Sequence, residues 1–138
     1  MTILNANKWK AIAMLYEKTF EIYISLSSRI QDNVFPEIVN ISKDAMNDND
    51  VSPYVDEIKE TTKEVHQKIS FIAERFSSLH LDAHGTAGKM YEEVGDLQNA
   101  AEMYMHSYDY CQDKSVEIFE MLAKKNINHK KLNPLYIQ

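Results

Sequence analysis

An unbroken apolar stripe from Val55 to Ala83 is the feature that most limits what this chain can fold into. Its members follow one another by three or four residues: Val55, Ile58, Thr62, Val65, Ile69, Ile72, Phe76, Leu79 and Ala83. That spacing places side chains on one face of an α-helix, whereas a strand alternates its faces at every second residue. An apolar stripe of this length is shielded from water only when it packs against other apolar surfaces. It therefore predicts a long helix that packs against other helices of the protein.

The N-terminal third of the chain carries a second stripe with the same spacing. It consists of Trp9, Ile12, Tyr16, Thr19, Tyr23, Leu26 and Ile30, widened by Phe20 and Ile24. Asn5 or Asn7 is expected to cap the start of this helix. Pro36 disfavours helical geometry at the residue before it, so we expect the helix to end near Phe35. A short helix over "PEIVNISKDAM" and a turn over "NDND" are predicted to follow.

Glycines and capping residues predict the boundaries in the second half. Ser52 and Pro53 suit the first turn of the long helix. Each interior glycine costs a helix about 1 kcal/mol relative to alanine, so Gly85 and Gly88 favour a break near "HLDAHG", where Asp82 caps a new helix. Gly95 is expected in the left-handed conformation, with Asp96 capping the next helix through the amide of Gln98 or Asn99.

The last long helix is predicted to start at Asp96 and to end in "KKNINHKKLNP". Its stripe is Leu97, Ala101, Tyr104, Tyr108, Cys111, Ile118 and Leu122. Three long stripes joined by short turns favour an all-α fold, an antiparallel helical bundle of three long helices plus one short helix. The chain is predicted to form a single helical domain over residues 1–138, with residues 126–138 as a flexible basic tail.

Charge and composition exclude several classes of function. The formal net charge is −6, and only Arg29 and Arg75 are arginines, which argues against binding to nucleic acid. No apolar run approaches the ~18 residues of a membrane span. The single cysteine, Cys111, excludes an internal disulfide, and the N-terminus lacks the pattern of a signal peptide. A cytoplasmic protein is expected.

Residues 81–114 resemble one tetratricopeptide repeat. The resemblance rests on Gly88 and Tyr91 in the first helix, Gly95-Asp96-Leu97 at the turn, and Ala100, Tyr104 and Ser107 in the second helix. In that family small residues let two helices approach closely while aromatic residues fill the space between them. The resemblance implies a repeat-like helical hairpin in the C-terminal half. His84 departs from the pattern, and no second copy of the repeat is found in register.

A catalytic set is not evident, so we expect no enzyme and no cofactor. His80 and His84 lie one helical turn apart, as in zinc helices of the HExxH type, but Leu81 replaces the glutamate. With His106 these histidines remain candidates for a metal or small-molecule site, although no metal is predicted. Cys111 lies on an apolar stripe, where a thiol usually acts as a small buried hydrophobe.

The segment "MYMHSYDY" is rich in tyrosine and methionine, which are frequent at adaptable interaction surfaces. Tyr91, Tyr104, Met105 and Tyr108 are therefore predicted to bind a partner helix or extended segment, although packing in a core explains the same stripe. The leading hypothesis is a non-enzymatic adaptor, secretion-type chaperone or inhibitor that binds another protein. The alternatives are a self-associating homo-oligomeric bundle and a histidine-based metal or small-molecule site.

Overall fold

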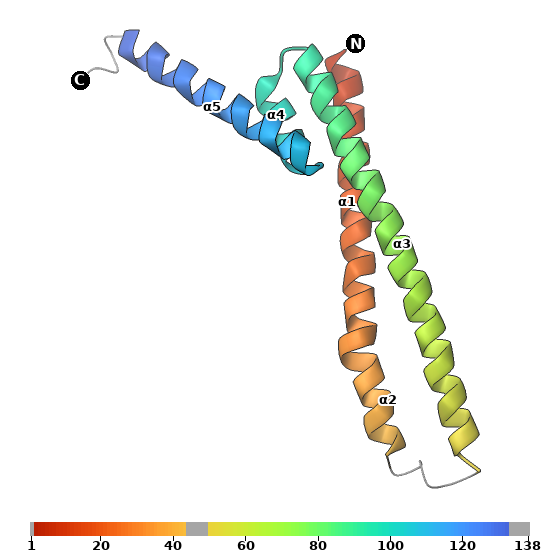
Figure 1. Ribbon diagram of the computed structural model, residues 1–138. Coiled ribbons are helices and arrows are strands. Elements are labelled where there is room, and N and C mark those ends of the chain that lie inside the picture. The colour runs from red at the N-terminus through yellow and green to blue at the C-terminus, as the bar shows by residue number, and fades with distance from the viewer. Residues whose placement is uncertain (1, 44–49, 133–138) are drawn as a thin grey trace. The chain divides into compact units, whose positions relative to one another are not determined.

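The protein is all-α in the part that the computed structural model describes, namely the backbone of residues 2–43 and 50–132 and the side chains of 2–43 and 50–126 (Figure 1). The helices are α1 (Ile3–Arg29), the π-helical turn η1 (Ile30–Val34), α2 (Phe35–Ser42), α3 (Ser52–Glu93), α4 (Leu97–Met105) and α5 (Asp109–Leu132). No strand occurs within these ranges. The predicted fold class, an antiparallel helical bundle, is confirmed.

The chain divides into two compact units, and α1 and α3 contribute to both of them. We call Met1–Tyr16 with Ser78–Gln138 the core unit, and Glu17–Ser77 the hairpin unit. The prediction of a single domain stays a prediction. The backbone of residues 126–132 belongs to α5, while the rest of the predicted basic tail lies outside the described residues. Part of the expected turn "NDND" and the end of "PEIVNISKDAM" also lie outside them.

The predicted end of the first helix at Phe35 is wrong. Phe35 keeps helical dihedral angles, φ −60° and ψ −49°, and its amide donates to the carbonyl of Ile30, five residues earlier. The wider π turn gives room to the ring of Pro36, which has no amide hydrogen and would otherwise crowd the preceding turn. The helix therefore continues through the proline as α2. Its start is capped by Thr2, whose Oγ1 accepts from the amide of Asn5 at 3.3 Å, and not by Asn5 or Asn7.

The predicted break near "HLDAHG" is also wrong, because α3 runs continuously from Ser52 to Glu93. Both interior glycines lie against side chains from later in the chain. A Cβ atom at Gly85 would lie 3.1 Å from Ser107 Oγ, and one at Gly88 would lie 2.6 Å from the ring of Tyr104. The lack of a side chain at these glycines lowers helix propensity, but it also lets Ser107 and Tyr104 pack closely against α3. This packing offsets the cost in helix propensity.

The turn after α3 confirms the expected capping. Gly95 has φ +82°, and the amide of Asn99 donates to Asp96 Oδ1 at 3.2 Å. The single long helix expected after this turn is wrong, because α4 ends at Met105 and α5 begins at Asp109. At this break the amides of Cys111 and Gln112 both donate to the carbonyl of Tyr108, at 2.8 and 3.0 Å.

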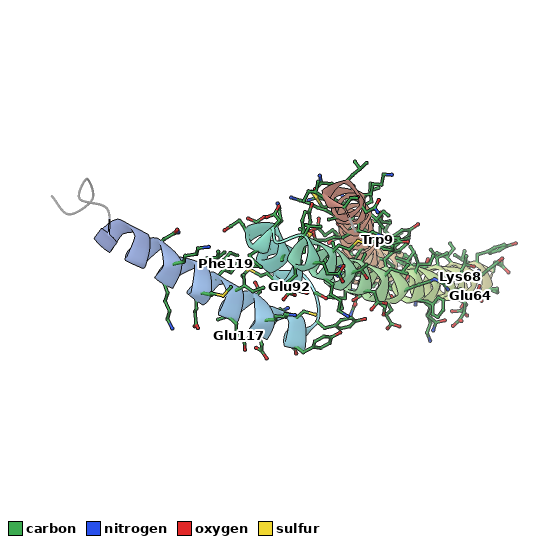
Figure 2. All side chains as sticks on the ribbon, turned by 90° about the horizontal axis from the view of Figure 1, so that it is seen from above. Trp9, Glu64, Lys68, Glu92, Glu117 and Phe119 are labelled. Carbon is green, nitrogen blue, oxygen red and sulfur yellow. The ribbon has the colours of Figure 1, made fainter. Side chains whose placement is uncertain are left out.

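Small residues and tyrosines form the centre of the core unit. Its buried hydrophobic cluster consists of Ala6, Ala87, Tyr91, Ala100, Ala101, Met103, Tyr104, Cys111 and Ile118. Trp9 and Phe119, both labelled in Figure 2, are partly buried and pack against this cluster. The alanines allow the helices to approach closely, and the aromatic rings occupy the remaining space.

The hairpin unit holds much less buried surface. Among its described residues only Ser42 and Ala73 are buried. The segments of α1 and α3 in this unit meet along a seam marked by Tyr23 and Phe76, whose rings stack at 5.7 Å. On the seam Ser27 Oγ lies 3.2 Å from His66 Nε2 and 3.1 Å from Ser70 Oγ. The apolar stripe of α3 is thus only partly covered by α1.

Candidate functional site

Tyr104 lies at the centre of a polar network within the core unit. Its ring packs over the backbone of Gly88, and its hydroxyl donates to Glu92 Oε1 at 2.7 Å. Lys114 Nζ, on α5, lies 2.8 Å from the same carboxylate oxygen and 5.2 Å from the centre of the Tyr104 ring. One carboxylate therefore links α3, α4 and α5 (Glu92 is labelled in Figure 2). The sequence pattern did not identify Glu92 or Lys114.

The charges in this network shift the pKa values of its members in opposite directions. Burial raises the pKa of Tyr104, and its hydrogen bond to the Glu92 carboxylate raises it further. Burial also acts to raise the pKa of Glu92. The hydrogen bonds from Lys114 and Tyr104, together with the charge of Lys114, outweigh burial, so the pKa of Glu92 lies below its ordinary value of 4.5. Tyr104 thus remains a neutral donor to a charged acceptor.

Replacing Glu92 with glutamine is expected to make stability less dependent on pH. Because the pKa of Glu92 is lower in the folded state, its ionised form stabilises the fold above pH 4.5, and this contribution is lost as the pH falls through the folded pKa. Glu92→Gln should lower the free energy of unfolding by about 1 kcal/mol at pH 7. The difference from wild type should shrink at acid pH, as the pH falls through the lowered pKa of Glu92. Urea unfolding at the two pH values measures this.

Glu93→Gln is the matched control for that prediction, because Glu93 is the neighbouring carboxylate on α3 and is exposed. It should cost less than about 0.5 kcal/mol at both pH values. An equal loss for Glu92→Gln at neutral and acid pH would contradict a role for the ionised carboxylate.

The four residues predicted to bind a partner differ in how far their side chains are exposed to solvent. Tyr91 and Tyr104 are 0% and 1% exposed, so the expectation that they face a partner is wrong for these two. Their rings fill the core, and their hydroxyls donate to Asn7 Oδ1 and Glu92 Oε1. Met105 is 47% exposed. Tyr108 is half-buried and donates to Asp82 Oδ1 at 2.7 Å.

The three candidate histidines lie together in the core unit. The rings of His80 and His84 are 5.6 Å apart, and those of His84 and His106 stack at 5.4 Å. His80 and His84 are buried, while His106 is exposed. Nδ1 of His84 lies 2.7 Å from the carbonyl oxygen of His80. This contact fixes the orientation of the His84 ring, so that its Nε2 atom lies on the side away from that carbonyl. The sequence predicted this proximity for His80 and His84 only, since they share one helix.

A small polar crevice lies beside the break between α4 and α5. Its volume is about 240 Å³, and its lining consists of Leu81, Asp82, Gly85, Thr86, Lys89, Ser107, Tyr108, Tyr110 and Cys111. Ser107 Oγ donates to the carbonyl of Leu81 at 2.7 Å, so this hydrogen bond connects α3 to the segment between α4 and α5. Cys111 is 4% exposed, which agrees with the expectation of a small buried hydrophobe.

The hairpin unit presents a very different surface. Many of its large apolar side chains are exposed: Ile22, Ile24, Leu26, Val34, Val39, Ile41, Val51, Tyr54, Ile58, Val65 and Phe71. An apolar crevice of about 290 Å³ lies where α2 meets the start of α3. It is lined by Ile38, Ile41, Ser42, Val51, Val55 and Ile58. An apolar crevice with exposed apolar side chains at its rim is typical of sites that bind another molecule.

These features define an all-α protein with one well-packed unit and one helical hairpin rich in exposed apolar side chains. Among the helices described, none combines the length with the apolar character that crossing a bilayer requires. Compared with protein families, curated proteins and solved structures, the chain gives no match. The likeness of residues 81–114 to a tetratricopeptide repeat stays a prediction.

Proposed function

We propose that the protein is a non-enzymatic protein–protein interaction module, an adaptor, secretion-type chaperone or inhibitor that receives a helical segment of another protein. The observation that supports this proposal is the exposed apolar surface of the hairpin unit, where Ile41, Ile58 and Phe71 are 69%, 52% and 68% exposed. A pair of helices offers a groove into which a third amphipathic helix fits. The proposal thus moves the partner surface away from Tyr91 and Tyr104.

Purification of the native complex tests this function. The full chain should elute with a second protein from an extract of its cells of origin, and the two purified proteins should bind again when mixed. Val65→Asp should weaken that reconstituted binding by about tenfold or more, because it places a charge in an apolar contact. Isothermal titration calorimetry with both purified proteins gives the affinity.

Gln67→Asp is the matched control, since it adds the same charge at an exposed position two residues away on α3. It should leave the affinity unchanged. Light scattering on the purified chain distinguishes the self-associating alternative. A dimer or larger oligomer that Val65→Asp dissociates, with no second protein in the native complex, would replace the proposed function by self-association.

A further inference from the structure

The break between α4 and α5 determines where His106 lies. Ser107, the next residue, donates from Oγ to the carbonyl of Leu81 at 2.7 Å. One residue further on, the Tyr108 hydroxyl donates to Asp82 Oδ1, also at 2.7 Å. Two hydrogen bonds therefore hold the segment after His106 against consecutive residues of α3. His106 itself is exposed, so its ring lies at the surface of the core unit.

The ring of His84 has one nitrogen bound to the backbone and one that lies away from it. Nδ1 is 2.7 Å from the carbonyl oxygen of His80. A carbonyl oxygen only accepts hydrogen bonds, so the hydrogen of this bond is on Nδ1. In the neutral ring, Nε2 then carries the lone pair that binds a metal ion. Histidines that bind metal ions typically donate their other ring nitrogen to a backbone carbonyl or a carboxylate in this way.

His84 and His106 lie at a separation that suits two ligands of one ion. Their rings stack with 5.4 Å between centres, and a nitrogen of each lies within 4.8 Å of the other. Zn²⁺ binds imidazole nitrogens at about 2.0–2.1 Å, so two such nitrogens on one tetrahedral ion are about 3.4 Å apart. Because His106 is exposed, a rotation of its side chain closes the remaining gap.

The properties of the two rings suit a divalent transition-metal ion. Imidazole nitrogen is a preferred ligand of Zn²⁺, Ni²⁺ and Cu²⁺, whereas Mg²⁺ and Ca²⁺ prefer oxygen. His84 is 1% exposed, so its ring is held in place by the core unit. The exposed ring of His106 leaves a path by which an ion enters from solvent. One ligand is thus rigid, while the other is adjustable.

From this arrangement we infer that His84 Nε2 and a ring nitrogen of His106 form a preformed binding site for one divalent transition-metal ion, of the class of Zn²⁺ and Cu²⁺. Water completes the coordination of the ion. The bound ion links α3 to the break between α4 and α5. The inference is independent of the proposed function, since both ligands belong to the core unit and the proposed partner surface belongs to the hairpin unit.

His80 is the other histidine of this cluster, and its contribution comes from the backbone. Its carbonyl orients the His84 ring, and its own ring packs edge-on against that ring at 5.6 Å. A change of the His80 side chain keeps the carbonyl, so the orientation of His84 is retained. We therefore expect metal binding to tolerate substitution of His80. A site made of His80 and His84, which share one helix, would instead require it.

Isothermal titration calorimetry with Zn²⁺ tests the inference. The full chain, free of any histidine tag, should bind one ion per chain. His106→Gln should weaken binding about tenfold or more, because it removes one of the two protein ligands. His84→Gln should do the same, but His84 is buried, so the exposed His106 provides the decisive variant. His80→Gln and His66→Gln are the controls, and each should change the affinity by less than about threefold.

The choice of ion and the melting temperature provide two further checks. Cu²⁺ should bind more tightly than Zn²⁺ by about tenfold or more, and Mg²⁺ should not bind. Zn²⁺ at about 100 times its Kd should raise the melting temperature of wild type by about 5 °C or more, because it binds the folded state. His106→Gln should lose most of this shift. Circular dichroism checks that the variant retains its helices.

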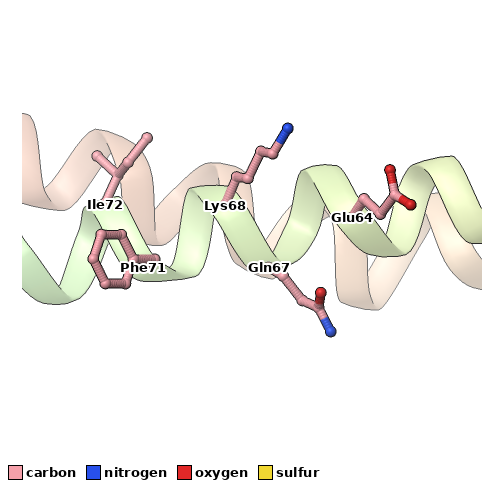
Figure 3. A pocket seen from close by; sticks show the side chains of 5 residues that line it. All are labelled: Glu64, Gln67, Lys68, Phe71 and Ile72. Atoms are coloured by element: carbon pink, nitrogen blue, oxygen red, sulfur yellow. The ribbon is translucent and has the colours of Figure 1, made fainter.

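An exposed pair of histidines serves as the reference for an ordinary site on a helix. Figure 3 shows Glu64 and Lys68 one turn apart on the same side of α3, and both are exposed. Adding Glu64→His and Lys68→His to the His106→Gln variant creates such a pair. It should bind Zn²⁺ about threefold or more weakly than the wild-type site. Both of its side chains lose rotamer freedom on binding, whereas the His84 ring is already fixed.

Several results would overturn the inference. It fails if wild type binds no Zn²⁺, or if His106→Gln leaves the affinity unchanged. A loss of binding in His80→Gln that His106→Gln does not share would assign the ion to the two histidines of α3 instead. A wild-type site that binds Zn²⁺ no more tightly than the reference pair would show that the site is not preformed.

Discussion

Gly88→Ala is expected to destabilise the protein, although alanine favours helices by about 1 kcal/mol relative to glycine. The new Cβ would lie 2.6 Å from Cδ1 and Cε1 of Tyr104, closer than two carbon atoms can approach. The ring has little room to move because it is buried and its hydroxyl is held by Glu92. We expect a net loss of about 1–3 kcal/mol in the free energy of unfolding. Thermal unfolding should show a decrease of roughly 4 °C per kcal/mol.

Lys89→Ala is the control for Gly88→Ala, because Lys89 is the next residue of α3 and is exposed. It should change stability by less than about 0.5 kcal/mol. Gly88→Ala with wild-type or higher stability would mean that α4 does not pack on α3 through Tyr104.

The helical class of the fold could be predicted because long apolar stripes with three- and four-residue spacing fit the face of an α-helix and do not fit a strand. The position of each helix end was harder. Gly85 and Gly88 lower helix propensity, so the sequence by itself predicts a helix break near "HLDAHG". Their actual role depends on Ser107 and Tyr104, which come roughly 20 residues later in the chain. Propensity along one segment carries no information about such a contact.

Pro36 shows the same limit in a different form. The residue before a proline generally avoids the ordinary helical geometry, which predicts a helix end at Phe35. A π turn over Ile30–Val34 resolves the conflict by adding a residue to the turn, and the helix continues. The break at His106–Tyr108 was missed because Tyr108 and Cys111 continue the apolar spacing of α4. Only Ser107, which bonds to the Leu81 carbonyl, signals a change, and serine is common in helices too.

The candidate site was predicted in part. Tyrosine and methionine spacing identified Tyr91 and Tyr104 as important, but spacing alone does not distinguish a core stripe from a binding stripe. Burial distinguishes them, because both hydroxyls find acceptors inside the core unit. The nine-residue apolar stripe of α3 is better evidence for a binding surface. It is wider than one neighbouring helix can cover, and its members Ile58 and Val65 are 52% and 45% exposed.

Tyr104→Ala is expected to have the largest effect of any single change proposed for this chain. It removes a ring that is 1% exposed, a hydrogen bond to Glu92 and the surface beneath Lys114. Truncation of a buried aromatic residue costs about 3–5 kcal/mol, a large part of the 5–15 kcal/mol typical of a domain. Tyr104→Phe keeps the ring and should lose only about 1 kcal/mol. Chemical denaturation measures both variants.

The double variant Gly88→Ala, Tyr104→Ala separates a core role for Tyr104 from a surface role. Once the ring is gone, a Cβ atom at residue 88 meets no Tyr104 side chain, so Gly88→Ala should stabilise the Tyr104→Ala background through its helix propensity, by up to about 1 kcal/mol. The same substitution destabilises wild type. Additive effects would show that Gly88 and Tyr104 do not touch. If Tyr104→Ala left stability unchanged and weakened partner binding instead, the ring would be a surface residue, as its spacing in the sequence also allowed.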